Sequence, residues 1–242
     1  MINWTFSRFP ESPPLRTTQL LERFFSIAEI EENQKYKIPK RQSEWLASRL
    51  LAKRLVQKII ASDSPLPLKS ITIQKESSGV PFVVVEGMGR VGWLSISHTR
   101  GGVLAAFSQI NSIRFGVDIE FIDPRPLEIF ADYFTVAEIA WLSPLNEQEK
   151  DVCSNLVWSA KEAFLKAIEK GLQMDTRKIN IHPPDVCSQS KGWNAIDFSV
   201  EGNRLLDWQL LFSLNHDYMM TICLPAVQKS QLIELELTSA FD

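Results

Sequence analysis

The sequence has few cysteines and no long hydrophobic run. Its 242 residues include three cysteines, Cys153, Cys187 and Cys223, which are far apart and form no C-x-x-C pair. This odd number at these spacings indicates neither a disulfide framework nor a zinc site, and a reducing compartment fits it best. The start, MINWTFSRFPESPP, lacks a basic segment followed by an apolar run, and no stretch approaches the roughly 18 apolar residues of a membrane helix. We therefore expect a cytoplasmic protein that does not bind a membrane.

An excess of charge of one sign is also missing. The 26 Lys and Arg residues against 29 Asp and Glu residues give a net charge of −3, which offers no general attraction for nucleic acid. The charge is unevenly distributed, because residues 33–60 hold eight basic residues and one acidic residue, a local charge of 8 − 1 = +7. This stretch is either the solvated face of a helix or a docking place for an anion.

The hydrophobic share of 45% and the aromatic share of 10% are enough for a sizeable core and exclude a disordered chain. The length fits one large domain or two small halves. Before Lys40 the pattern is irregular, with a short helix near 18–33, and a longer helix is predicted from Ser43, its expected N-cap, to about 61. Because this helix is apolar over more than one face, we expect it to lie between two packed elements.

The rest of the chain alternates between strand and helix patterns. A helix capped by Thr135 and a longer one near 147–170 are predicted in the second half. Strands are predicted at 70–74, 81–86, 92–97, 103–108, 114–121, 207–214, 218–224 and 232–237. The order indicates an α+β fold of two halves, 1–110 and 111–242, each with a helix on a small antiparallel sheet and a ligand site between them. We find no convincing internal sequence repeat.

Two acidic residues follow each other at strand spacing in the run GVDIE, residues 116–120. A strand places Asp118 and Glu120 on one face and the apolar residues between them on the other. One interpretation is the solvent face of a strand. The other is a half-buried acidic site, in which the two carboxylates raise each other's pKa unless a cation neutralises them.

Two further motifs carry candidate site residues. In WSAKEAFLKA, residues 158–167, Glu162 and Lys166 are four residues apart on one helix face, which suits either a surface ion pair or a site. In SISH, residues 95–98, His98 ends a predicted strand. It can bind a phosphate or transfer a proton, or it can satisfy a nearby backbone group.

Taken together and in this order, SISH, GVDIE and WSAKEAFLKA resemble the signature motifs of the Sfp-type 4′-phosphopantetheinyl transferases. The resemblance implies a pseudo-dimer of two similar α+β halves with the active site between them. It also implies Mg²⁺-dependent transfer of 4′-phosphopantetheine from coenzyme A to a serine of an apo acyl, polyketide or peptidyl carrier protein, releasing adenosine 3′,5′-bisphosphate. A monomer is expected, because two halves already supply both walls of the site.

The resemblance also assigns roles to residues. Asp118, Glu120 and Glu162 match metal ligands, and Glu162 matches a proposed base that acts directly or through a water. Lys166 matches a residue that is catalytic and, like Lys161, meets phosphate groups. The remaining matches are to coenzyme A contacts, the 3′-phosphate region above all: Ser97, His98, Arg49, Arg41 and, among the same basic run, Lys35, Lys37 and Lys40.

One position departs from the family pattern, since Val80 stands where the family usually has the lysine of Gly-Lys-Pro. Lys75 or Arg100 would have to compensate. A silent carrier-protein or nucleotide-binding module, and a Mg²⁺-dependent nucleotide hydrolase that uses water as nucleophile, stay as alternatives. Phe130, Tyr133 and Phe134 are candidates for contact with the acceptor protein, although they equally suit packing between helix and sheet.

Overall fold

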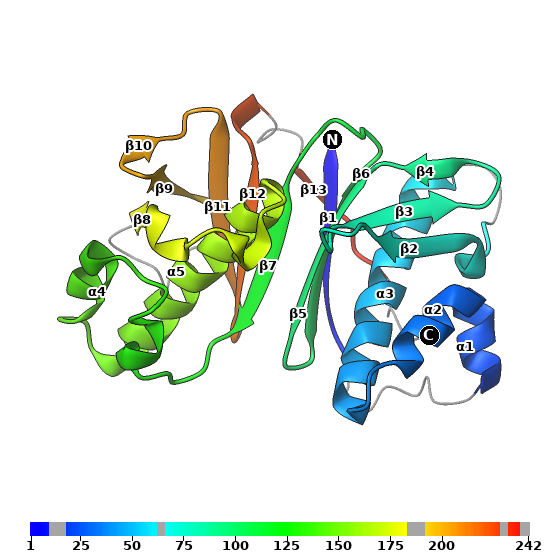
Figure 1. Ribbon diagram of the computed structural model, residues 1–242, viewed down its shortest axis with the longest axis horizontal. Coiled ribbons are helices and arrows are strands. Elements are labelled where there is room, and N and C mark those ends of the chain that lie inside the picture. Colours follow the sequence, from blue (N-terminus) through cyan, green and yellow to red (C-terminus); the bar gives the residue numbers. More distant parts are fainter. Residues whose placement is uncertain (10–17, 62–65, 183–191, 228–231, 238–242) are drawn as a thin grey trace. The chain divides into compact units, whose positions relative to one another are not determined.

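The computed structural model describes residues 1–9, 18–61, 66–182, 192–227 and 232–237, so Cys187 lies outside the described residues. The chain forms two compact units, Met1–Ile113 with Gln231–Asp242, and Arg114–Ser230. Both combine helices with mainly antiparallel sheets (Figure 1), which confirms the α+β class. The sequence-based division differs, because it gave the last predicted strand to the second half. No helix in the described ranges is long and apolar enough to cross a membrane.

The first unit contains two sheets. Its four-stranded sheet has the order β13-β1-β6-β5 and is antiparallel except for β13, which runs parallel to β1, and its other sheet has the order β2-β3-β4. The start of the chain is therefore not irregular, because β1 is an inner strand. The strands are β1 (Ile2–Arg8), β2 (Ile71–Lys75), β3 (Pro81–Val85), β4 (Gly89–Val91), β5 (Trp93–Thr99), β6 (Gly102–Ser108) and β13 (Leu232–Glu234).

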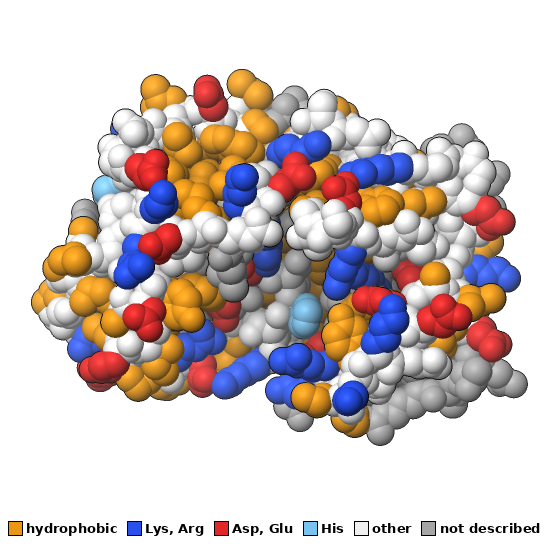
Figure 2. Space-filling model, viewed as in Figure 1, with side chains coloured by type: hydrophobic (Ala, Val, Ile, Leu, Met, Phe, Trp, Pro, Cys, Tyr) orange, Lys and Arg blue, Asp and Glu red, His pale blue; other side chains and the backbone are white. Residues whose placement is uncertain are grey.

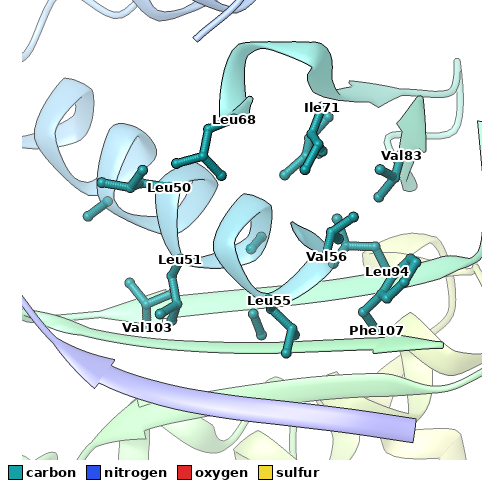
Figure 3. Close-up of a cluster of buried hydrophobic side chains, with 14 of the residues drawn as sticks. Leu50, Leu51, Leu55, Val56, Leu68, Ile71, Val83, Leu94, Val103 and Phe107 are labelled. Atoms are coloured by element: carbon teal, nitrogen blue, oxygen red, sulfur yellow. The ribbon is translucent and has the colours of Figure 1, made fainter. Parts of the chain in front are cut away.

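The helices of this unit are α1 (Thr18–Phe24), α2 (Ile27–Gln34), α3 (Pro39–Ile60) and the 3₁₀ turn η1 (Leu68–Ser70). The expected N-cap at Ser43 is wrong: α3 starts four residues earlier with Pro39 in its first turn, where a missing N–H costs nothing. As predicted, α3 lies between two layers. Figure 3 shows Leu51 and Leu55 on the side of the sheet residue Val103, and Leu50 on the opposite side with Leu68.

The second unit has one larger sheet with the order β10-β9-β11-β12-β7, to which β8 adds by pairing with β9. Its helices are η2 (Leu127–Phe130), α4 (Val136–Leu142), α5 (Glu147–Ala167), η3 (Gly171–Gln173) and η4 (Thr176–Lys178). Its strands are β7 (Gly116–Phe121), β8 (Ile179–His182), β9 (Asn194–Val200), β10 (Asn203–Arg204), β11 (Trp208–Asn215) and β12 (Tyr218–Pro225). The long helix α5 packs on β7 and β12, as Figure 1 shows. β8, β9 and β10 are not among the strands predicted from the sequence.

A buried ion pair organises each unit in the same way. In the first unit, Glu29 caps α2 through Ser26 and binds the Lys53 ammonium of α3 at 2.6 Å. Its other oxygen accepts a hydrogen bond from the Ile73 amide of β2 at 3.1 Å. The Lys53 ammonium also lies 4.9 Å from the ring of Phe25. One carboxylate thus joins two helices and a strand.

The second unit repeats this arrangement residue by residue. Glu138 caps α4 through Thr135, which confirms the predicted capping box, and binds Lys161 of α5 at 2.7 Å. Its other oxygen accepts a hydrogen bond from the Ile181 amide of β8 at 2.7 Å, and Lys161 lies 5.3 Å from the ring of Phe134. The segments concerned read FSIAE at 25–29 and FTVAE at 134–138. The chain therefore holds a short internal repeat that the sequence analysis did not find.

Candidate active site

The two acids of GVDIE lie on β7, an edge strand of the sheet in the second unit. Asp118 is 4% exposed, and its neighbours Val117 and Ile119 are buried as well. Glu120, nearer the end of the strand, is partly exposed. The strand is therefore covered on both faces at Asp118, and the solvent-face interpretation is wrong for this residue.

Helix α5 brings Lys166 to this strand. Its ammonium lies 2.6 Å from Asp118 Oδ1 and 3.2 Å from the carbonyl oxygen of Val117. The close approach depends on Gly116, because a Cβ there would lie 2.1 Å from the carbonyl oxygen of Ala163. The glycine and the small helix residue let β7 and α5 come together, and this contact sets the position of Lys166 beside Asp118.

Burial raises the pKa values of two carboxyl groups in this region, Glu120 and Glu162. It raises the pKa of Glu120 to about 7, with the charge of Asp118 acting in the same direction and the Arg125 guanidinium opposing it. Burial likewise raises the pKa of Glu162, where the Lys166 charge opposes the increase and Asp118 adds to it. These effects indicate a crowded acidic site that a further cation would stabilise.

The acids fit a magnesium ion by their chemistry, although no group of three His, Cys, Asp or Glu side chains is close enough to hold a metal among the described residues. Two of the acids pair with positive side chains instead, Asp118 with Lys166 at 2.6 Å and Glu120 with Arg125 at 3.2 Å. Glu162 Oε1 is buried and has no hydrogen-bond partner within the described chain. Mg²⁺ takes oxygen ligands, one or two carboxylates with water and phosphate being enough.

Lys161 was expected to contact phosphate, but its side chain lies in the core beside Glu138. It is fully buried, and its ammonium binds Glu138, the Tyr133 carbonyl oxygen and the Thr176 carbonyl oxygen at 2.7, 3.0 and 3.0 Å. A lysine ammonium has three N–H donors, so these three oxygens use all of them. The geometry gives Lys161 a structural role in place of the expected phosphate contact.

Tyr133 is the exposed member of the three aromatic candidates for acceptor contact. It is 41% exposed and meets Trp158 of α5 edge to face at a centroid distance of 5.2 Å. Phe130 and Phe134 are buried and stack on each other at 4.5 Å. Packing explains these two phenylalanines.

The remaining expected contacts belong to the first unit. Ser97 and His98 lie near the end of β5, the serine buried and the histidine exposed, and Arg41 is exposed on α3. Arg49 is 6% exposed, its guanidinium lies 5.1 Å from the Trp45 ring, and its Nε has no hydrogen-bond partner in the described residues. Figure 2 shows both positive and negative side chains on the visible face.

Arg49 lines a pocket of about 350 Å³ between α2, α3 and β2. Trp45, whose buried indole Nε1 also has no hydrogen-bond partner in the described chain, lines the same pocket, as do Lys35 and Lys75. Acidic residues reach it too, and one of them, Glu32, binds Lys35 at 3.0 Å. Two residues that line this pocket thus carry an N–H group for which the described chain supplies no acceptor, and a ligand with acceptor oxygens would suit them.

Three important residues escaped the sequence analysis. Arg125 is separated from Glu120 by five positions of irregular chain, and no pattern signals that contact. Trp45 was recognised only as an apolar helix position. For Glu138 the capping box was visible, and its distance of 23 residues from Lys161, close to the 24 between Glu29 and Lys53, could have revealed the repeated ion pair.

Comparison with known proteins agrees with this arrangement. Residues 114–223 match the family model of the 4′-phosphopantetheinyl transferase superfamily. These residues span β7, α5 and β12, so they include all the acids and Lys166. The class of protein that the second unit resembles is thus a transferase of this superfamily.

Individual relatives make the likeness more specific. The chain is 28% identical to the 4′-phosphopantetheinyl transferase gsp of Aneurinibacillus migulanus over 51% of this chain and 48% of that protein. It is 29% identical to the transferase Sfp of Bacillus subtilis, over 55% of this chain and 58% of that protein. A longer match, at 23% identity over 81% of this chain and 82% of the relative, is to the transferase HetI of a Nostoc species. These matches confirm the resemblance to the Sfp-type transferases, although the chain covers only about half of the length of the first relatives.

Proposed function

We propose that this protein is a 4′-phosphopantetheinyl transferase, a holo-acyl-carrier-protein synthase. It transfers the 4′-phosphopantetheine group of coenzyme A to a serine hydroxyl of an apo acyl, polyketide or peptidyl carrier protein and releases adenosine 3′,5′-bisphosphate. The observation that carries the proposal is the ion pair of Lys166 with Asp118 at 2.6 Å, near the half-buried carboxyl of Glu162. Similarity of residues 114–223 to the superfamily supports it.

In this reaction the serine oxygen attacks the β-phosphorus of coenzyme A, and the bond from that phosphorus to the bridging oxygen breaks. Lys166 neutralises charge that develops on the phosphate oxygens, and its place beside a buried carboxylate fixes its ammonium. Glu162 takes the proton of the serine, directly or through a water. A raised pKa favours this role, because a base works best when its pKa lies near the working pH.

Asp118, Glu120 and Glu162 would hold the metal ion of this proposal, with Mg²⁺ as the expected species. When bound, it would screen the diphosphate and stabilise the leaving phosphate. The carboxylates project from β7 and α5, and the close approach of these two elements at Gly116 fixes their spacing. The buried Glu162 Oε1 supplies an acceptor oxygen that the described residues leave unused.

The pocket of the first unit supports the coenzyme A part of the proposal. Arg49, whose Nε has no partner in the described residues, suits the 3′-phosphate. Lys75 lines the same pocket and could replace the lysine that the family has at the position of Val80. Ser97 and His98 remain proposed contacts for the phosphate groups. Lys35 and Arg41 are further cations of the same basic run, Lys35 reaching the pocket itself.

The repeated ion pairs support the proposal that the protein is a pseudo-dimer of two similar halves. We also propose that it is a monomer and that it acts in the cytoplasm. Neither nucleic acid nor a membrane is a proposed partner.

Intact-protein mass spectrometry tests the proposal. Several apo carrier proteins are incubated with the enzyme, coenzyme A and Mg²⁺, with EDTA and Asp118→Ala samples as controls. A mass gain of one phosphopantetheine that both controls abolish is expected. Loss of phosphopantetheine from coenzyme A without any gain on a carrier would favour a hydrolase, and coenzyme A binding without either reaction would favour a silent binding module.

The coenzyme A contact is tested with the same assay. Arg49→Ala should raise KM for coenzyme A more than KM for 3′-dephospho-coenzyme A, because only the first carries the phosphate assigned to this residue. An equal effect on both donors would remove that assignment and leave the transferase proposal standing.

A further inference from the structure

Arg125 is the cation of the acidic site that no role in the proposed transfer requires. Its guanidinium lies 3.2 Å from Glu120 Oε2, and the two side chains are only 27% and 16% exposed. The residue is five positions beyond Glu120, in the segment between β7 and η2. A contact at this burial is held more firmly than an ion pair in free solvent.

The chain around Arg125 restricts where its side chain can reach. Pro124 and Pro126 flank it, so the φ angles on both sides are fixed and the backbone of Arg125 itself is held in extended conformations. At the end of β7, the Ile122 amide donates to the Asp217 carbonyl oxygen at 2.8 Å, which anchors the start of the segment. The guanidinium is thus presented to Glu120 from a stiff segment.

Both acids of β7 have a cationic partner in the structure without a divalent ion. Each carboxylate of the strand has its own positive partner, Lys166 for Asp118 and Arg125 for Glu120. A divalent ion that takes oxygens from both acids has to compete with these two cations. The proposed function gives Lys166 a role in transfer and gives Arg125 none.

We propose that Arg125 is a built-in competitor for the metal at Glu120, so that it sets the Mg²⁺ affinity of the site and holds the acidic strand together when no metal is bound. This inference rests on the proposed function in one respect, that Mg²⁺ binds at Asp118 and Glu120. The residue acts on the metal through Glu120 and is a positioning residue, because it touches neither substrate nor reacting atoms.

Isothermal titration calorimetry with MgCl₂ alone, in the absence of coenzyme A, tests this inference. Arg125→Gln removes the charge and keeps much of the side-chain volume, and we expect its Kd for Mg²⁺ to fall about three- to tenfold, since a partly buried pair of this kind is worth about 1 kcal/mol. Arg125→Lys should return the Kd most of the way to the wild-type value. Arg114→Gln is the matched control, because Arg114 binds Glu169 at 2.6 Å and its loss removes the same charge from the same unit.

Thermal unfolding gives a second readout that activity does not affect. With EDTA, Arg125→Gln should unfold at a lower temperature than the wild type, and saturating Mg²⁺ should raise its Tm by more than it raises that of the wild type. An unchanged or weaker Mg²⁺ affinity, or an equal gain in the Arg114→Gln control, would overturn the inference. Absence of Mg²⁺ binding to the wild type at millimolar concentration would instead overturn the metal part of the proposed function.

Discussion

Removal of the Lys161 ammonium decides whether this residue is structural or binds coenzyme A. The structure places it in a fully buried pair with Glu138, and the family resemblance suggested a phosphate contact. Lys161→Met keeps the length and apolar stem of the side chain and deletes the charge. The carboxylate of Glu138 then stays buried with its two backbone partners but without its counter-ion.

The expected loss follows from the burial of both partners. Breaking a buried ion pair on one side costs about 3–5 kcal/mol, which is a large share of a total stability of about 5–15 kcal/mol. For a chain of this size, 1 kcal/mol corresponds to about 2–4 °C, so the Tm should fall by about 6–20 °C. The double variant Glu138→Gln with Lys161→Met should recover much of this loss, because no uncompensated charge remains.

Urea unfolding followed by fluorescence measures these energies. Two matched variants bracket the result. Lys53→Met removes the equivalent ammonium in the first unit, also fully buried against Glu29, and should cost a similar amount. Lys178→Met removes an exposed partner of Glu201 at 2.7 Å and should change stability far less than Lys161→Met, because solvent screens an exposed pair. A loss below about 1 kcal/mol for Lys161→Met, with a raised KM for coenzyme A, would refute the structural role and restore the phosphate contact.

Two further predictions concern the acidic strand. Burial raises the pKa of Glu120 from 4.5 to about 7, so the native state binds this proton more tightly than the unfolded chain does. The protonated carboxyl therefore stabilises the fold by up to about 3 kcal/mol. This contribution is complete below pH 4.5 and is lost as the pH rises through about 7. Urea unfolding over this pH range in EDTA should show the decline, and Glu120→Gln should flatten it; an identical slope in the variant would contradict the assignment. Gly116→Ala places a Cβ 2.1 and 2.5 Å from main-chain atoms of Ala163 and Ala167, and main-chain atoms cannot move away as a side chain can. Stability should fall by about 1–3 kcal/mol or more, and the transfer activity should fall with it. Wild-type values of both would contradict the close packing of β7 on α5.

Local chemistry explains what could be predicted from the sequence. Thr135 and the acid three positions later form the expected capping box, and alternation of acid and apolar residues marked β7 as the strand of the acidic site. These signals lie within a few residues of one another. The likeness of three motifs to one family then supplied an order and a set of roles that no single motif carries.

Long-range contacts explain what could not be predicted. β1 was missed because it gains its place between β6 and β13, strands that lie far along the chain. Lys161 sits next to Glu162 in sequence, and neighbouring helix positions point in different directions, so one turns into the core and the other toward the acidic site. No local pattern separates these two roles, because the partner oxygens of Lys161 come from Glu138 of α4, from Tyr133 just before α4 and from Thr176 of η4.

The internal repeat lets the two units be compared at matching positions, and the proposed acids occur in one unit only. Lys53 and Lys161 fill the same structural place, yet the next residue is Arg54 in α3 and Glu162 in α5. The first strand of each unit differs in the same sense, since β1 reads INWTFSR without an acidic residue and β7 reads GVDIEF with two. Mg²⁺ takes oxygen ligands, and of the two matched strands only β7 carries carboxylates, while at the position after the buried lysine only α5 carries one. The duplicated ion pair therefore supports folding in both units. Asp118, by contrast, has no counterpart on β1 of the first unit, so no residue there could replace it.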